Sequence, residues 1–367
     1  MTYLVTALEA RPLRVPLVEP FVIASATMTE TRAVEIRAVV TRGGETATGL
    51  GEAATLAPVT RESDAQILEA MPTARAALVG TPLETIDALA TPLDAVAGAM
   101  PVFRAGLESA IVDAITRLEG RSVAAELAGQ ASAPPTLVTD ITLPITRDEA
   151  HAVRLAQGWA ARGFDTFKVK VGRDREADVR ALRAVMAAVP GARVRLDANG
   201  GYAAADALAL LDALDAERAR IECFEQPCGK QDLAGMAEVT ARGGVPVVAD
   251  ESVATLADLD AVLAARAAHG INLKLVKQGG LLAAVRLGAR AKAEGLRLMA
   301  GAMVETRLGL VAMAHVVWAL GGVDFVDLDT AFLLEGDPYE GGWAGIDGRR
   351  LALAGGPGLG VRRRDER

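Results

Sequence analysis

The sequence is poor in the residues that build disulfide frameworks and histidine-based sites. It holds only two cysteines, Cys223 and Cys228, and three histidines, which are scattered at positions 151, 269 and 315. Two cysteines make no disulfide framework, and without a nearby histidine they are a poor zinc site. The scattered histidines also argue against a Ser-His-Asp triad. We therefore expect reduced thiols in a cytoplasmic protein whose chemistry rests on other residues.

Long apolar runs and basic clusters are missing too. No run reaches the length of a membrane span, and we expect neither a signal peptide nor a membrane partner. The net charge of −8 and the lack of any basic-aromatic patch argue against binding to nucleic acid. With 367 residues, 51% of them hydrophobic, the chain has more core material than a single ordinary domain needs.

The first 120 residues read as strands followed by helices. Strands are predicted at residues 3–7, 32–40 and 47–53, with the Thr- and Ala-rich segment 19–31 as a loop. The segment Thr81-Pro82-Leu83-Glu84 resembles a capping box and predicts a short helix. An apolar stripe predicts a longer helix over residues 101–119. We therefore predict an α+β capping domain at residues 1–120.

From about residue 135 short β-branched runs alternate with Ala-rich amphipathic stretches. The runs lie at residues 136–144, 166–171, 193–198, 221–224, 245–249, 271–276, 297–302 and 324–328. This repeat favours an α/β fold, a modified TIM (β/α)8-type barrel over residues 121–339. A doubly wound open sheet is the alternative, although no Gly-x-Gly-x-x-Gly follows a strand. The tail, residues 340–367, is expected to return to the capping domain.

The second predicted barrel strand carries two lysines in an apolar run. Lys168 and Lys170 are two residues apart, so both side chains should point to the same face. Mutual repulsion and partial burial would lower their pKa toward ~7–8, where a lysine serves as a general base. An exposed edge strand with solvated lysines is the alternative interpretation.

Acidic residues end the next three strands, at the barrel edge where such enzymes place their chemistry. These residues are Asp197, Glu225 and Asp250. Three carboxylates at one mouth would repel one another unless a cation lies among them, and oxygen ligands suit Mg²⁺. For any single acid, capping of the following helix is the alternative.

The sixth strand supplies a lysine on the opposite side of the barrel. Lys274 would face Lys170 over the metal, with one lysine on either side of a bound ligand. Two bases on opposite faces of a carbon acid permit epimerisation through an enediolate, and the same layout also serves proton abstraction followed by elimination. Lys277 is an odd number of residues from Lys274, so we expect it on the other face of the strand, at the surface or behind the site.

The last two strands contribute pocket residues. Strand seven ends without a charged residue, so Met303 is expected only to line a pocket. Strand eight carries Asp327 and Asp329, two apart and hence on one face, a pair that suits a substrate ammonium group. A helix cap plus a solvated acid is the alternative.

Several segments spread over nearly the whole chain form a recognisable set. They are Lys168-Val-Lys170, Asp197-Ala-Asn199, Glu225-Gln-Pro227, Asp250-Glu-Ser252, Lys274-Leu-Val-Lys277-Gln-Gly-Gly, Gly49-Leu-Gly-Glu52-Ala and Gly356-Pro-Gly-Leu-Gly360. The set resembles the muconate lactonizing enzyme subgroup of the enolase superfamily, which pairs basic residues with Mg²⁺. The resemblance implies that Asp197, Glu225 and Asp250 bind Mg²⁺. It also implies that Lys170 and Lys274 are the acid/base pair and that Lys168 tunes Lys170.

Within this subgroup, Asp327-Leu-Asp329 is similar to the Asp-x-Asp motif of dipeptide epimerases. In those enzymes the two acids hold the α-ammonium of a dipeptide, and the α-carbon of its C-terminal residue is epimerised. The resemblance therefore implies a Mg²⁺-dependent dipeptide epimerase, expected to be a homo-oligomer. An N-acylamino acid racemase, an o-succinylbenzoate synthase or a lactonizing enzyme of the same subgroup is the alternative. A non-catalytic barrel that binds a small peptide is a third hypothesis.

The N-terminal loop departs from the pattern of L-Ala-D/L-Glu epimerases. In those enzymes an arginine of this loop pairs with the glutamate side chain, whereas residues 20–30 here hold no arginine and Ser25 or Ala26 takes its position. We therefore expect a substrate other than L-Ala-L-Glu. Glu30 would favour a cationic side chain. An apolar pocket is instead predicted from Phe21, Ile23 and Met28.

Overall fold

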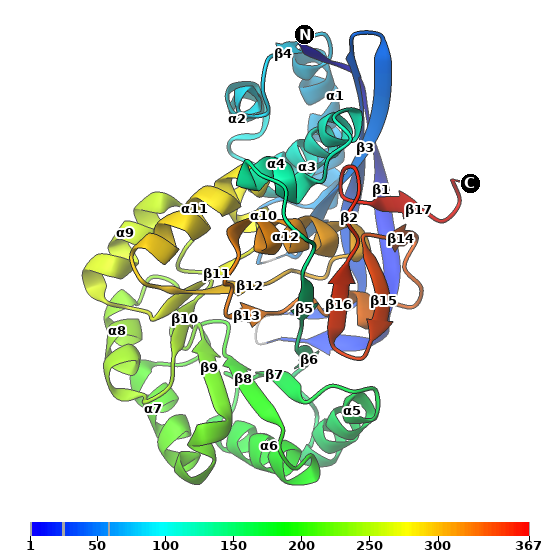
Figure 1. Cartoon of the computed structure of the whole chain (residues 1–367). Helices are drawn as coiled ribbons and strands as arrows, with labels where there is room; N and C mark the ends of the chain where they lie inside the picture. Colours follow the sequence, from blue (N-terminus) through cyan, green and yellow to red (C-terminus); the bar gives the residue numbers. More distant parts are fainter. Residues whose placement is uncertain (1, 24–25, 58, 367) are drawn as a thin grey trace.

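The computed structural model describes residues 2–23, 26–57 and 59–366. An antiparallel sheet with its helices forms one part, and a curled parallel sheet surrounded by helices forms the other (Figure 1). Among the described residues, no helix has both the length and the apolar character needed to cross a membrane.

The N-terminal sheet has the strand order β3-β2-β1-β4. Its strands are β1 (Tyr3–Val22), β2 (Thr27–Arg42), β3 (Glu45–Thr55) and β4 (Pro82–Leu83). The prediction of a loop over residues 19–31 is wrong, because β1 and β2 continue as a hairpin until Val22 pairs with Thr27. β-Branched residues such as Thr27, Thr29 and Thr31 favour this extended pairing.

The helices of this part are α1 (Asp64–Leu78), η1 (Asp87–Leu89), α2 (Ala90–Ala97), α3 (Pro101–Leu118) and α4 (Val123–Ala128). Of these, α1 and α3 pack on the sheet, while α2 packs on these two helices and α4 on α3 and α12 (Arg307–Leu320). The predicted helix from residue 101 is confirmed as α3. A Cβ at Gly51 would collide with the carbonyl oxygen of Gly106, so the glycine allows α3 to lie directly against β3. The predicted helix at Thr81-Pro82 is wrong, because Pro82 and Leu83 pair with β1 and bury Leu83.

The parallel sheet follows the chain from β6 to β13. Its strands are β6 (Ile141–Leu143), β7 (Thr166–Lys170), β8 (Arg193–Asp197), β9 (Ile221–Glu225), β10 (Val247–Ala249), β11 (Gly270–Leu273), β12 (Arg297–Ala300) and β13 (Phe325–Val326). The backbone N–H of Asp140 donates to the carbonyl of Val326 (3.2 Å), which links the first strand to the last. The predicted barrel-type sheet is confirmed, and every strand end faces the same edge.

Helices cover the outside of the parallel sheet (Figure 1). They are α5 (Glu149–Ala161), α6 (Arg175–Ala188), α7 (Ala204–Ala213), η2 (Asp215–Arg220), α8 (Leu233–Arg242), α9 (Leu256–Ala265), α11 (Leu281–Ala293) and α12 (Arg307–Leu320). Two short elements, α10 (Leu275–Gln278) and η3 (Thr330–Phe332), instead follow the carboxyl ends of β11 and β13. The amphipathic stretches of the sequence thus bury their apolar stripes against the strands, as residues of α11 such as Leu287 and Ala291 do.

The C-terminal tail runs back along the N-terminal part. It forms β14 (Tyr339–Gly341), β15 (Trp343–Asp347), β16 (Arg350–Leu353) and β17 (Val361–Arg363), and β16 pairs with β5 (Thr136–Val138). Arg363 Nη1 lies 2.7 Å from Glu35 of β2, and Arg117 of α3 donates to the carbonyl of Val361 (2.7 Å). The tail strands form two small sheets of their own, β14-β17 and β15-β16-β5, and the tail contacts the N-terminal part through these side chains. The domain boundaries at residues 120 and 339 stay predictions.

A buried carboxylate of β3 binds the N-terminus of α12. Glu52 accepts backbone hydrogen bonds from Thr306 and Gly309, each at 3.0 Å. Burial and the neighbouring Glu305 raise the pKa of Glu52 to about 8. Because Glu52 belongs to the sheet and Thr306 to the barrel, this contact fixes the position of the two parts relative to each other.

Candidate active site

Three carboxylates meet at the carboxyl edge of the barrel. Asp197 and Glu225 are direct partners in the β8–β9 ladder, and Asp250 follows the end of β10. All three are fully or almost fully buried. Parallel strands end at the same edge, so the sequence order alone places these acids side by side.

Both lysines of β7 point into this group of acids. Lys168 Nζ lies 3.1 Å from Asp197 and 2.7 Å from Glu225, and Lys170 Nζ lies 2.5 Å from Asp197. Burial lowers the pKa of Lys168, but Asp327, Glu225 and Asp197 raise it well above its ordinary value. The prediction that repulsion lowers this pKa is therefore wrong, because carboxylates outnumber ammonium groups around Lys168.

Lys274 and Lys277 both contact Asp250. Lys274 Nζ lies 2.8 Å from Asp250 Oδ2, while Lys277 binds the other carboxylate oxygen and donates to the carbonyl of Asn272 (2.9 Å). The expectation that Lys277 faces away from Lys274 is wrong. The strand β11 ends at Leu273 and the helix α10 follows, so residues three apart lie on one side. Burial lowers the pKa of Lys277.

The donor set of Asp197, Glu225 and Asp250 fits a divalent cation. Burial and the charges of Asp197 and Asp250 raise the pKa of Glu225 to about 7, which reflects an excess of negative charge. Glu225 Oε2 is buried and forms an ion pair with Lys168 Nζ at 2.7 Å, but no aligned hydrogen bond reaches it from the described residues. A hard cation with oxygen ligands, such as Mg²⁺, would give the three carboxylates a further positive partner and relieve the repulsion.

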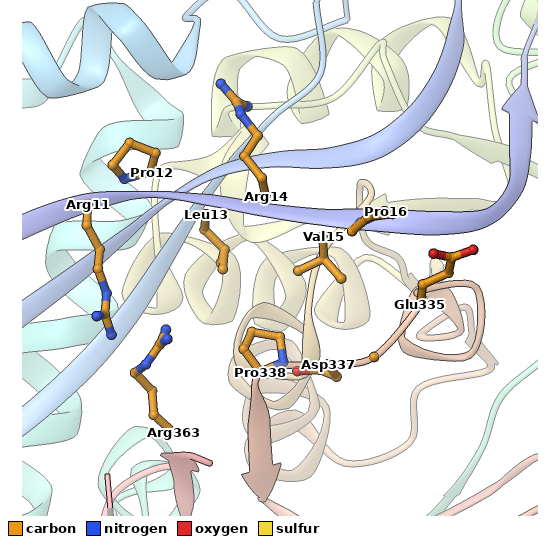
Figure 2. Close-up of a pocket in the computed structure, with 11 residues that line it drawn as sticks. Arg11, Pro12, Leu13, Arg14, Val15, Pro16, Glu335, Asp337, Pro338 and Arg363 are labelled. Carbon is orange, nitrogen blue, oxygen red and sulfur yellow. The ribbon is translucent and has the colours of Figure 1, made fainter. Parts of the chain in front are cut away.

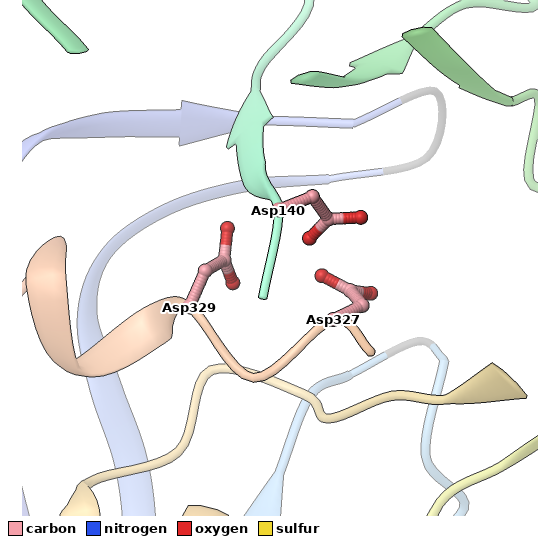
Figure 3. A group of neighbouring side chains, drawn as sticks. All are labelled: Asp140, Asp327 and Asp329. Atoms are coloured by element: carbon pink, nitrogen blue, oxygen red, sulfur yellow. The ribbon is translucent and has the colours of Figure 1, made fainter. Parts of the chain in front are cut away.

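A second group of acids lies beside the first. Asp140, which the sequence analysis missed, faces Asp327 and Asp329, and each offers an oxygen within 4.8 Å of the others (Figure 3). Asp327 is paired with Lys168 (2.7 Å) and Asp140 with Arg195 (2.8 Å). Asp329 has no ion-pair partner among the described residues, and its Oδ2 accepts from the backbone N–H of Thr142 (2.5 Å). Burial and Asp327 raise the pKa of Asp329 to about 7.

One pocket unites most of the residues singled out from the sequence. Its lining includes Phe21, Ile23, Met28, Lys168, Lys170, Lys274, Met303, Asp327 and Asp329. It also includes Thr142, Asn199 and Glu251, which were not predicted. Ser25 lies outside the described residues. Glu30 does not line the pocket and instead pairs with Arg32 (3.3 Å) and Arg14 (3.8 Å).

A separate pocket lies away from these residues, between β1 and the segment 335–338 (Figure 2). Its three arginines are already neutralised: Arg11 and Arg363 each lie 2.7 Å from Glu35, and Arg14 is paired with Asp64. None of the lysines or acids of the barrel edge lines it. We therefore place the candidate active site at the barrel edge.

Comparisons with known proteins agree with this geometry. Residues 6–129 match the model of the mandelate racemase/muconate lactonizing enzyme N-terminal domain, and residues 151–367 match the enolase C-terminal domain-like model. A hydrophobic dipeptide epimerase of Citrifermentans bemidjiense is 36% identical over 358 residues, which are 96% of each chain.

Two solved structures share the fold over nearly their whole length. A substrate-liganded complex of the L-Ala-D/L-Glu epimerase from Bacillus subtilis superposes with a TM-score of 0.91 at 31% identity, covering 97% of this chain and 98% of the other. A dipeptide epimerase from Enterococcus faecalis, complexed with Mg and L-Leu-L-Tyr, gives 0.90 at 28% identity, covering 98% and 100%. The chain therefore belongs to the mandelate racemase/muconate lactonizing enzyme family of enolase-like proteins.

Proposed function

We propose that this protein is a Mg²⁺-dependent dipeptide epimerase that inverts the α-carbon of the C-terminal residue. The observation that carries the proposal is the placement of the unpaired carboxylate Asp329 in the same pocket as Lys170 and Lys274. An acid that is free to bind an ammonium group, next to two lysines, suits a substrate with a free N-terminus. The relatives named as dipeptide epimerases support the same assignment.

Asp197, Glu225 and Asp250 would hold the metal ion. When bound, Mg²⁺ supplies positive charge that stabilises the negative charge developing on the substrate carboxylate. Lys170 ends β7 and Lys274 directly follows β11, on different sides of the barrel. One lysine takes the α-proton from its face of the substrate and the other returns a proton to the opposite face, which inverts the carbon. Lys168 lies between Asp197 and Glu225, and its charge tunes Lys170, which contacts the same oxygen of Asp197.

Asp327 and Asp329 would bind the α-ammonium of the dipeptide. Asp327 already balances Lys168, so the spare negative charge of the pair resides on Asp329. Because both carboxylates are buried, water competes weakly for the ammonium group and the charge-assisted hydrogen bonds are strong.

The pocket favours an apolar C-terminal side chain. Besides the lysines and the acids, its lining includes the apolar side chains Ile23, Met28, Leu56, Val59 and Met303. The earlier hypothesis of a cationic side chain loses its support, since Glu30 pairs with Arg14 and Arg32 outside this pocket. L-Ala-L-Leu is therefore expected to be a better substrate than L-Ala-L-Glu or L-Ala-L-Lys.

The test is a set of steady-state rates on L-Ala-L-X dipeptides, with X apolar, acidic or basic. We expect the highest kcat/KM with apolar X, loss of activity in EDTA and recovery on addition of Mg²⁺. A preference for acidic or basic X would contradict the pocket assignment. Turnover of N-acylated amino acids without turnover of any dipeptide would contradict the substrate class and favour the racemase alternative.

Two further expectations accompany the proposal. We expect the enzyme in the cytoplasm, since the two cysteines are buried free thiols. We also expect a homo-oligomer, which light scattering on a gel-filtration column measures directly.

A further inference from the structure

A second cavity, of about 850 Å³, lies between the end of β1 and helix α5. Its walls are residues 18–22 of β1, the segment after β6 and one face of α5, and Phe332 and Leu333 close its end. Two backbone hydrogen bonds of 2.9 Å hold the β1 wall, from Val18 to the carbonyl of Leu333 and from Ile145 to the carbonyl of Val22. These bonds fix the β1 wall to the segments that carry Leu333 and Ile145.

This groove meets the active-site pocket at Phe21 and Thr142, which line both cavities. The backbone N–H of Thr142 donates to Asp329, so the junction lies where we place the substrate ammonium. The N-terminal α-carbon is bonded to that nitrogen, and its side chain therefore starts at the junction. The active-site cavity itself measures about 50 Å³, room for a few water molecules, so a large N-terminal side chain needs the space next to it.

The groove combines apolar walls with an excess of positive charge. Apolar side chains that line it include Ile145, Leu155, Trp159 and Phe332. Three arginines, at positions 147, 154 and 162, line it together with one acid, Glu19, which lies 3.5 Å from His151; of the three, Arg147 is paired with Asp148 at 3.5 Å. The guanidinium of Arg162 lies over the ring of Trp159, 4.2 Å from its centroid. Arg154 is exposed and has no ion-pair partner among the residues that the structure describes.

We propose that this groove binds the side chain of the substrate's N-terminal residue and selects an acidic one. The inference rests on the proposed dipeptide epimerase function and adds a preference at the residue that is not epimerised. The apolar walls take the methylene groups of a glutamate side chain, and Arg154 pairs with its carboxylate. A lysine at the same position meets Arg154 and Arg162, and this repulsion disfavours it.

The test compares kcat/KM for L-Glu-L-Leu, L-Ala-L-Leu and L-Lys-L-Leu in the presence of Mg²⁺. We expect L-Glu-L-Leu to exceed L-Lys-L-Leu by roughly tenfold, since several partly exposed charges act together. Arg154→Glu is expected to reverse this order. The matched control is Arg242→Glu, which makes the same charge change on an exposed arginine of another barrel helix, α8, and should keep the wild-type order.

Each outcome has a distinct meaning. Equal rates for L-Glu-L-Leu and L-Lys-L-Leu, or an unchanged order in Arg154→Glu, would overturn the subsite. The proposed function would survive that result as long as L-Ala-L-Leu is epimerised. A reversal in Arg242→Glu as well would assign the effect to net charge and also overturn the subsite. If no dipeptide is epimerised, the proposed function fails and the subsite fails with it.

Discussion

The substitution Asp329→Asn should make the protein more stable and its catalysis worse. The pKa of Asp329 is raised from 3.8 to about 7, first by burial and then by Asp327. A carboxyl group whose pKa is raised on folding contributes stability below its unfolded value of 3.8, and this contribution is lost as the pH rises through about 7. A shift of this size corresponds to about 4 kcal/mol at most, at about 1.4 kcal/mol per pH unit.

The asparagine amide carries no charge at any of these pH values and keeps an oxygen for the backbone N–H of Thr142. We expect a gain of about 2–4 kcal/mol in the free energy of unfolding at pH 8, and a gain that disappears toward pH 4. Urea unfolding in EDTA at several pH values measures it. With Mg²⁺, the same variant should lose about 10- to 150-fold in kcat/KM for L-Ala-L-Leu, the value of one charge-assisted hydrogen bond.

Asp324→Asn is the matched control, because Asp324 lies just before β13 and binds the backbone N–H of Leu298 (2.9 Å) away from the pocket. It should leave kcat/KM unchanged. If Asp329→Asn keeps the wild-type kcat/KM for dipeptides, Asp329 does not bind the ammonium group. If the variant is less stable than the wild type at pH 8, the argument from the raised pKa is refuted.

Three further predictions concern the lysines, a glycine and a buried acid. Lys170→Ala and Lys274→Ala should each lower the epimerisation rate, measured by polarimetry, by at least about 10²-fold. The lysine that remains should still exchange the α-proton on its own face of the substrate. Full epimerisation activity in either variant would exclude the two-base mechanism. In Gly301→Ala the new Cβ would lie 2.7 Å from Asn272 and 3.0 Å from Lys274, so kcat should fall while the circular dichroism spectrum stays unchanged. Glu305→Gln removes a charge that raises the pKa of Glu52. In the wild type the free energy of unfolding should decrease as the pH rises from 6 to 8, and in the variant this decrease should be smaller by about 1–3 kcal/mol. An identical pH dependence in urea unfolding would contradict the coupling between Glu305 and Glu52.

The barrel architecture was predictable from the sequence because it rests on periodicity. Each strand run ends at one edge, and so the order of the runs alone brings Asp197, Glu225 and Asp250 together. The resemblance to the family rested on the same strand ends. Residues within a strand, such as Lys168 and Lys170, followed the alternation that the sequence predicts.

The errors arose where tertiary contacts override a local pattern. Pro82 carries a helix-start signal, but pairing with β1 and burial of Leu83 win. Lys277 was assigned to a strand that in fact ends at Leu273, and one helical turn brings it back to Asp250. The hairpin of β1 and β2 forms because both strands find a partner, which no single segment reveals.

Asp140 was missed for a different reason. It lies directly before β6 and faces Asp327 and Asp329 only because the first and last strands of the barrel meet. An acid at the start of an apolar strand, Thr139-Asp140-Ile141-Thr142, was the one available signal. The alternation rule places Asp140 and Thr142 on one face, which would have suggested that both point into the barrel.

The central claim is proton transfer at the C-terminal α-carbon of a dipeptide. The most direct test is ¹H NMR of L-Ala-L-Leu in D₂O with the enzyme and Mg²⁺, following the α-proton of leucine. The account predicts that this signal disappears as deuterium enters and that the resonances of L-Ala-D-Leu grow at the same time, with neither change in EDTA. Exchange without growth of the second diastereomer would contradict transfer to both faces, and no exchange with any dipeptide would contradict the proposed function.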